Sequence, residues 1–232
     1  MNKLCSGYYH TNKQSYGKRR GNSGSQHPSL KTVIKRRRNH NTLAKQLLYC
    51  KVSGGTVAAL LWGQQHETDA LQSYQMSLGS GLTVHEVGVF IGNSGFLGAS
   101  PDGIVKDCSG HTVHLVEVKC PYKARSKTVE EMYDDASFCC SLVNGKPTLR
   151  QDHDYYYQVQ GQMAITGIHT CDFVVWTPLN FLVITLVFDE GFWKTQCYPS
   201  LKNFYFNIML PEIVYPKHPE LPLDYSHLPL YD

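Results

Sequence analysis

The stretch GFLGASPDGIVKDCSGHTVHLVEVKCPY, residues 95–122, decides the fold and points to the chemistry. Apolar residues alternate with other residues over 112–122, which is the period of a β-strand, and KDCSG before it is typical of a turn between antiparallel strands. Both faces of this strand begin apolar, so we expect a central strand covered on both sides. Glu117 and Lys119 then share one face near the end of the strand.

A carboxylate buried at that position needs a cation, because desolvating an unpaired charge is costly. Two arrangements satisfy Glu117: a structural ion pair with Lys119, or a bound metal ion. Asp102 on the neighbouring strand favours the metal, because two carboxylates at one strand end repel each other unless a divalent cation binds both. Ligands that are all oxygen favour a hard cation such as Mg²⁺ or Mn²⁺.

A third carboxylate is expected from the helix that precedes the strands. Residues 56–79 have helical periodicity, and Glu67 falls on the apolar stripe beside Leu71 and Tyr74. Glu67 either reaches water from the margin of the stripe or belongs to a site. The set of an Asp, a Glu-x-Lys and a helical Glu suits phosphodiester hydrolysis, in which a metal binds the phosphate and activates water while the lysine positions that water or stabilises charge.

The rest of the chain predicts one domain between two tails. Further helices are expected at 42–50, 130–139, 154–167 and 192–210, and further strands at 83–91, 96–105, 171–178 and 181–188. This order favours an α/β (α+β) fold with a mixed central β-sheet flanked by α-helices. We expect a basic disordered tail over 1–30, a domain over 31–210 and a Pro-rich extended tail over 211–232.

Charge and cysteine content suggest partners and compartment. The net charge is only +3, but residues 1–51 contain no acidic residue and include a basic cluster, Lys35, Arg36, Arg37 and Arg38. Such a segment suits nucleic acid, although a solvated tail or a nuclear-import signal has the same composition. The eight cysteines show no C-x-x-C spacing, and we find no hydrophobic leader and no membrane-spanning run. We therefore expect an intracellular protein with reduced thiols, nuclear in a eukaryotic host and otherwise cytoplasmic.

Four motifs in consistent order resemble one known family. SPDGIV and LVEVKCPY, with LLWGQQHETDALQSY before them and YYYQVQGQM after them, resemble the YqaJ-type viral recombinase and lambda exonuclease family of the PD-(D/E)XK nuclease superfamily. The resemblance covers about residues 58–190, whereas residues 1–50 carry no convincing copy of the family's N-terminal motif. It implies a restriction-endonuclease-like core and a YqaJ-like nuclease domain over 31–210.

The resemblance also implies roles for individual residues. The metal ligands would be Asp102, Glu117 and the Val118 carbonyl, with Glu67 reaching a metal directly or through water. Lys119 would be the catalytic base or would position the water. Gln158 would orient Lys119 or that water, and Gln160 is the weaker candidate because it also fits an exposed polar position on a helix.

The implied function is metal-dependent DNA hydrolysis at duplex ends, 5′ to 3′, by a two-metal mechanism, in recombination or in the processing of viral or mobile-element DNA. The cluster Lys35–Arg38 would bind DNA, and the family suggests a homo-oligomer and a single-strand annealing protein as partners. Two alternatives stay open: an endonuclease of the same superfamily, and an inactive nucleic-acid-binding or assembly module on the same fold. Retention of Asp102, Glu117 and Lys119 favours an enzyme over the inactive module.

Overall fold

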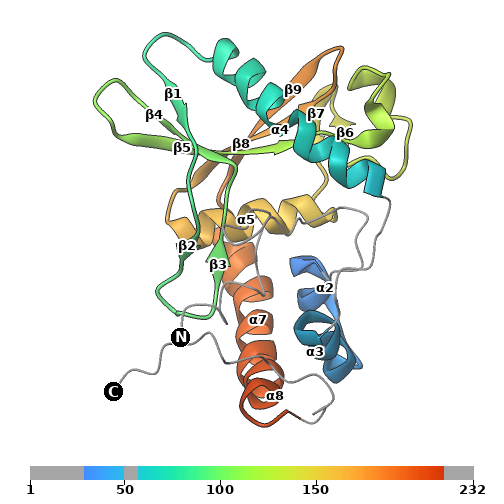
Figure 1. Cartoon of the computed structure of the whole chain (residues 1–232), viewed down its shortest axis with the longest axis vertical. Helices are drawn as coiled ribbons and strands as arrows, with labels where there is room; N and C mark the ends of the chain where they lie inside the picture. Colours follow the sequence, from blue (N-terminus) through green and yellow to red (C-terminus); the bar gives the residue numbers. More distant parts are fainter. Residues whose placement is uncertain (1–28, 50–56, 217–232) are drawn as a thin grey trace.

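A five-stranded mixed sheet forms the centre of the computed structural model, which describes residues 29–49 and 57–216 (Figure 1). The strand order is β1 (Thr83–His85), β4 (Gly103–Lys106), β5 (Thr112–Lys119), β8 (Thr170–Trp176) and β9 (Phe181–Val187). Only β5 and β8 run parallel; the other neighbouring pairs are antiparallel. The strand that carries Glu117 and Lys119 is therefore the central one, as its two apolar faces predicted.

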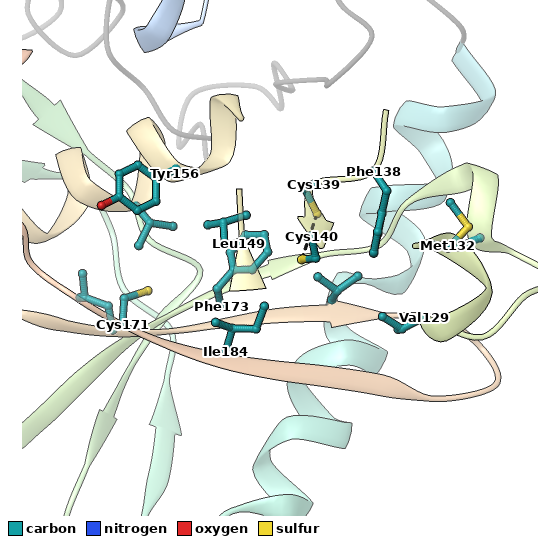
Figure 2. Close-up of a cluster of buried hydrophobic side chains, with 14 of the residues drawn as sticks. Val129, Met132, Phe138, Cys139, Cys140, Leu149, Tyr156, Cys171, Phe173 and Ile184 are labelled. Carbon is teal, nitrogen blue, oxygen red and sulfur yellow. Dashed lines mark hydrogen bonds between the residues drawn. The ribbon is translucent and has the colours of Figure 1, made fainter. Parts of the chain in front are cut away.

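Two helices cover the two faces of this sheet. Helix α4 (Val57–Ser77) buries Ala70 and Leu71 in a cluster with Val116 and Val118. Helix α5 (Asp154–Thr166) packs on the opposite face, in the cluster drawn in Figure 2. Helix α5 ends where Gly167 adopts a left-handed φ of 74°, which glycine does without steric cost.

A buried polar network fastens α4 to the sheet. The hydroxyl of Tyr74 donates to Asp172 Oδ2 at 2.6 Å, and Thr185 Oγ1 donates to Asp172 Oδ1 at 2.7 Å. His114 Nε2 lies 3.3 Å from Asp172 Oδ2 and 2.8 Å from the Tyr74 hydroxyl. The network joins α4 to three adjacent strands on the face that α4 covers.

A second helical layer lies beyond α5 (Figure 1). It consists of α2 (Leu30–Lys35), α3 (His40–Tyr49) and a continuous helical run made of α6 (Glu190–Phe192), η3 (Trp193–Cys197), α7 (Tyr198–Phe204), η4 (Tyr205–Met209) and α8 (Leu210–Val214). Their apolar side chains share one buried cluster with Tyr157 of α5. Pro199 lies in the first turn of α7, after a π-helical turn, so the helical run continues through it.

The tails differ from expectation where the structure describes them. Residues 211–214 were expected in an extended tail but belong to α8, because Pro211 occupies a first-turn position where its missing N–H costs nothing. Residues 217–232 of that tail and residues 1–28 of the predicted N-terminal tail lie outside the described residues.

Two predicted strands are each divided. The stretch 83–91 forms β1 and β2 (Phe90–Ile91), and 96–105 forms β3 (Gly98–Ala99) and β4. Strands β2 and β3 pair with each other in a separate two-stranded sheet. Pro101 interrupts the second stretch because it has no backbone N–H to donate to a ladder.

The region 122–150 differs most from the sequence prediction. The helix expected at 130–139 is only a short 3₁₀ turn, η2 (Glu130–Met132), preceded by η1 (Tyr122–Ala124). It is followed by a hairpin of β6 (Cys140–Val143) and β7 (Lys146–Leu149). Asn144 and Gly145 have φ values of 51° and 75°, and an Asn-Gly pair at a two-residue turn is a strong hairpin signal that we did not use.

Two further features concern the described residues only. None of their helices is both long enough and apolar enough to span a bilayer. Their six cysteines form no disulfide, although the adjacent thiols of Cys139 and Cys140 lie 3.6 Å apart (Figure 2).

Candidate active site

The end of β5 carries a buried ion pair. Lys119 Nζ lies 2.5 Å from Glu117 Oε1, and the side chains are 11% and 0% exposed. The ammonium also lies 4.8 Å from the ring centroid of Tyr155, within cation–π distance. Burial lowers the pKa of Lys119, but the charges of Glu117, Tyr155 and Asp102 together outweigh burial and raise it. Lys119 is therefore held as a cation that faces α5.

Two amides from α5 complete the surroundings of Glu117. Gln158 Nε2 donates to Glu117 Oε1, and Gln162 Nε2 donates to Glu117 Oε2 at 2.8 Å. These glutamines are four residues apart, so they lie on one face of the helix. We expected Gln158 to orient Lys119 or a water; its recorded hydrogen bond goes instead to the carboxylate that pairs with Lys119. Sequence reasoning missed Gln162 and Tyr155, although the helical spacing from Gln158 offered a signal for the first.

Gln160 has a different environment from the one we expected. It is 1% exposed rather than a surface residue. Its amide donates to the Val187 carbonyl at 3.1 Å, and its carbonyl accepts from the Asp189 N–H at 2.8 Å. Gln160 therefore joins α5 to the end of β9 and faces away from Glu117.

Asp102 reaches the same strand end from the loop before β4. Its Oδ2 accepts the Val118 N–H at 2.8 Å. Backbone pairing between β4 and β5 ends at Gly103 and Val116, so the Asp102 side chain takes the place of a backbone partner for Val118. A β-carbon at Gly103 would lie 3.0 Å from a methyl of Val116 and 3.1 Å from the His85 carbonyl, so glycine permits this close approach. Because the N–H and C=O of a strand residue point to the same side, the Val118 carbonyl also points toward Asp102.

The carboxylates interact through their charges. Burial raises the pKa of Asp102 well above its ordinary value, and the charges of Glu117 and Glu67 raise it further while Lys119 opposes them. Glu67 extends from α4, on the opposite face of the sheet from α5, and is half-buried. The Cys120 thiol donates to the neighbouring His66 carbonyl at 3.5 Å, so this turn of α4 lies against the end of β5. Asp102 thus lies within electrostatic range of carboxylates from two elements, β5 and α4.

The donor atoms of these residues suit a hard divalent cation, because all of them are oxygen. Two of the carboxylates are also buried, and their like charges repel each other. A cation between them would offset the repulsion that raises the pKa of Asp102. In the arrangement observed, no three His, Cys, Asp or Glu side chains among residues 29–49 and 57–216 gather closely enough to enclose an ion. Glu117 instead accepts hydrogen bonds from Lys119, Gln158 and Gln162.

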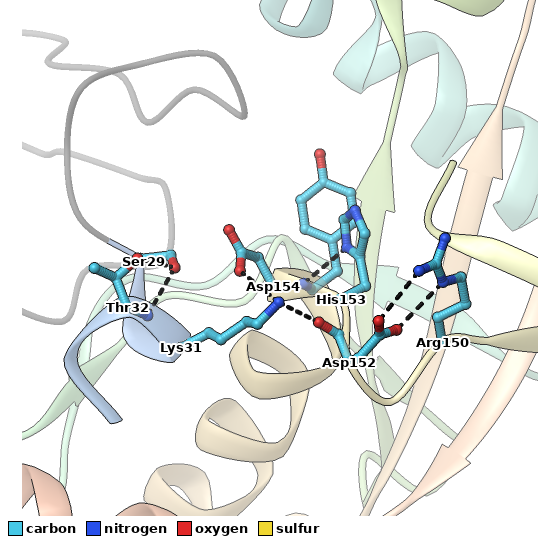
Figure 3. Close-up of polar contacts among 8 residues, drawn as sticks. Ser29, Lys31, Thr32, Arg150, Asp152, His153 and Asp154 are labelled. Carbon is cyan, nitrogen blue, oxygen red and sulfur yellow. Dashed lines mark hydrogen bonds and ion pairs between the residues drawn. The ribbon is translucent and has the colours of Figure 1, made fainter. Parts of the chain in front are cut away.

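The basic cluster Lys35–Arg38 belongs to the folded helical layer. Lys31 of α2 donates to the Asp152 carbonyl and lies 3.9 Å from Asp154, while Arg150 pairs with Asp152 at 3.1 Å (Figure 3). These contacts attach α2 to the start of α5.

Helix α2 ends at Lys35, and Arg36–Arg38 form the turn to α3. The recorded contacts of this cluster join it to its own turn and to α5 and η3, not to the carboxylates. Its role in binding DNA stays a prediction.

Comparison with solved structures finds the same fold elsewhere. An alkaline exonuclease from Laribacter hongkongensis, LHK-Exo, superposes with a TM-score of 0.57 at 24% identity over 80% of this chain and 87% of that one. Its complex with dAMP gives a TM-score of 0.58 at 25% identity over 83% and 91% of the two chains. The restriction-endonuclease-like core that the sequence predicted is therefore confirmed.

Two viral proteins share sequence with this chain. The alkaline nuclease of Autographa californica nuclear polyhedrosis virus is 31% identical over 123 residues, which are 47% of this chain and 29% of that protein. The alkaline nuclease of Orgyia pseudotsugata multicapsid polyhedrosis virus is 29% identical over 128 residues, 49% and 30% of the two proteins. The match therefore spans less than a third of the length of either viral nuclease.

Residues 13–169 match the YqaJ-like viral recombinase domain. The match extends to residue 13 and so takes in a segment without a convincing copy of the family's N-terminal motif. The matched range includes Glu67, Asp102, Glu117, Lys119 and Gln158. Because it covers more than half of the sequence, the chain belongs to the YqaJ-like viral recombinase family.

Proposed function

We propose that the chain is a metal-dependent deoxyribonuclease that digests duplex DNA from its ends, 5′ to 3′. The observation that carries the proposal is the arrangement at the end of β5, where Lys119 pairs with Glu117 at 2.5 Å and Asp102 is held against the Val118 N–H at 2.8 Å. Family membership supports nuclease chemistry, since the viral relatives are named alkaline nucleases and LHK-Exo is named an alkaline exonuclease.

The residues that would hold Mg²⁺ or Mn²⁺ are Asp102, Glu117 and the Val118 carbonyl, with Glu67 approaching from α4. When bound, the metal would polarise the scissile phosphate and lower the pKa of the attacking water, and in the two-metal form the two ions together would stabilise the attacking and the leaving oxygen. The protein would contribute orientation, because Gln158 and Gln162 donate to the two oxygens of the Glu117 carboxylate and so limit its rotation.

Lys119 would act as a cation in this reaction. Its pKa is raised because the charges of Glu117, Tyr155 and Asp102 together outweigh burial, so a protonated ammonium is available beside the carboxylates. A positioned cation stabilises the negative charge that develops on the phosphate oxygens and can hold the attacking water by a hydrogen bond. Of the two roles that the family resemblance offered, this favours positioning and charge stabilisation over proton abstraction.

The test is a cleavage assay on linear duplex DNA and on a covalently closed circle, each with Mg²⁺, with Mn²⁺ and with EDTA. We expect cleavage of the linear form from the 5′ end, none of the circle, and none in EDTA. Lys119→Ala should lower the rate at least about 100-fold, the usual scale for such a group. Cutting of the circle would identify an endonuclease, and DNA binding without cleavage would identify the inactive module. A homo-oligomer and an annealing partner stay predictions that sizing and pull-down experiments can address.

A further inference from the structure

A row of aromatic side chains borders the candidate active site on the α4 side. Trp62 and His66 lie one helical turn apart with ring centroids separated by 4.0 Å. The His66 ring stacks on Trp176 at 5.3 Å and 22°. Trp62 meets Tyr122 edge to face at 6.0 Å. The four rings, which we call the aromatic row, run from the end of β8 across α4 to η1.

The aromatic row is adjacent in sequence to two residues of the candidate active site, Glu67 and Lys119. His66 immediately precedes Glu67, and Tyr122 follows Lys119 by three residues. The Cys120 thiol donates to the His66 carbonyl at 3.5 Å, which brings these two segments together in space. A polymer whose phosphate reached Asp102 would therefore have its neighbouring groups close to these rings.

The rings differ from core aromatics in exposure and charge. Trp62, Tyr122 and Trp176 remain partly exposed, whereas the core rings Tyr74 and Phe173 are 1% and 0% exposed. The exposed guanidinium of Arg125 lies 4.4 Å from the Tyr122 ring centroid and extends the row with a positive charge.

The indole orientation at the other end of the row is fixed by a hydrogen bond. Trp176 Nε1 donates to Ser73 Oγ at 3.0 Å, so that ring is held in place before any ligand binds. A set of oriented, partly exposed rings with a cation at one end matches the chemistry of nucleobases joined by phosphates, because every base has a π-face and stacking is tolerant of sequence.

We propose that the aromatic row binds unpaired nucleobases of single-stranded DNA beside the candidate active site. The inference rests on the proposed function for its choice of polymer, but it concerns base contacts rather than cleavage. Bases would stack on the exposed parts of the Trp62 and Tyr122 rings, while Arg125 would bind a phosphate. A solely structural role, in which the rings anchor α4 to the sheet, would give no preference for bases.

The test compares an oligothymidylate with an abasic oligonucleotide of equal length, which has the same phosphates and no bases. Binding is measured by fluorescence anisotropy in EDTA, so no cleavage occurs. We expect the wild-type protein to bind the oligothymidylate at least about tenfold more tightly. Tyr122→Leu should reduce this preference toward unity, chiefly by weakening binding of the oligothymidylate. Phe206→Leu, at an aromatic residue 44% exposed on η4, serves as the control and should keep the preference.

Three results would overturn the inference: equal affinity of the wild type for the two strands, no binding of either strand, or equal loss of preference in Tyr122→Leu and Phe206→Leu. Folding of Tyr122→Leu is checked by circular dichroism. If this variant does not fold, Trp62→Tyr is measured instead, and it should keep most of the preference because it retains a ring. If neither variant folds, the wild-type comparison of the two strands tests the inference. Cleavage of duplex DNA in Mg²⁺ is measured separately. Cleavage without a base preference rejects the aromatic row alone, and a base preference without cleavage rejects the proposed nuclease.

Discussion

The amide of Gln162 donates to Glu117 Oε2 at 2.8 Å, and both side chains are fully buried. Gln158 on the same face of α5 donates to the other oxygen of this carboxylate. Glu117 is thereby oriented by a helix on which no carboxylate of the proposed ligand set lies. Groups that orient ligands in this way commonly affect metal affinity or activity by 10- to 100-fold.

We therefore predict that Gln162→Met lowers the cleavage rate about 10- to 100-fold. Gln160→Met is the matched control, because it makes the same substitution in a buried position two residues earlier. Gln160 bonds to the backbone at Val187 and Asp189, so its loss should cost about 1–3 kcal/mol of stability for each backbone group left unpaired. Rates are measured in single turnover and stabilities by urea unfolding. Equal rates for the two variants would show that Gln162 has no special role.

The charge at Asp102 should cost stability in the absence of metal. Burial and the nearby Glu117 raise the pKa of Asp102, so ionisation is less favourable in the folded state than in the unfolded state. A carboxyl with a raised folded pKa loses stabilising free energy as pH rises from the unfolded value to the folded one, and at neutral pH its charge opposes folding. Asparagine removes that charge and can still accept the Val118 N–H.

Asp102→Asn should accordingly raise Tm in EDTA, abolish the Tm increase that Mg²⁺ gives the wild type, and abolish cleavage while DNA binding persists. Thermal unfolding with and without Mg²⁺ measures the first two effects. Glu86→Gln, at an exposed position directly after β1, controls for a change of net charge. A Tm that falls in EDTA, or cleavage at the wild-type rate, would contradict the assignment.

The sequence was most informative where charged residues interrupt a regular apolar pattern. The alternation over 112–122 predicted that Glu117 and Lys119 share a face of a central strand, and β5 has this place in the sheet. Asp102 and Glu67 followed from the same cost of buried charge. Periodicity assigns a side chain to a face of its own element, but it does not identify the partner on another element. That is why Gln160 was placed at the surface and Gln162 and Tyr155 were overlooked.

Other differences arise from local chemistry. The strand expected over 96–105 is broken at Pro101, and the hairpin around Asn144 and Gly145 carried a turn signal that the acidic stretch before it obscured. The position of the basic cluster depends on tertiary contacts of α2, such as that of Lys31 with Asp154. These contacts join residues more than 100 positions apart, and no local pattern encodes them.

The Tyr74–Asp172 network predicts a pH dependence of stability. Burial raises the pKa of Asp172, but hydrogen bonds from His114, Thr185 and Tyr74 outweigh burial and lower it. The stabilising free energy of a carboxylate with a lowered folded pKa is present above its unfolded pKa and is lost as pH falls through the folded value. Asp172→Asn should therefore destabilise the protein at neutral pH by about 1.5–3 kcal/mol, and the difference from wild type should shrink below about pH 4. Urea unfolding across this range measures it, and a difference independent of pH would contradict it.

The basic cluster permits a test of how the protein holds DNA. Arg37 and Arg38 are exposed in the turn between α2 and α3, and the recorded contacts of the cluster do not reach the carboxylates. We therefore expect the cluster to contact phosphates along the DNA backbone rather than the 5′-terminal phosphate alone. Each phosphate contact removed should reduce the slope of log K against log salt concentration by about 0.9.

Arg38→Ala should thus weaken binding of 5′-phosphorylated and 5′-hydroxyl linear duplexes alike, with a shallower salt dependence for both. Lys146→Ala, at an exposed lysine of the β6–β7 hairpin, removes the same charge from a different surface and should change neither slope. Affinities are measured in EDTA over a salt series. A loss confined to the phosphorylated duplex would contradict general backbone contact and would indicate that this turn holds the terminal phosphate through charge-assisted hydrogen bonds.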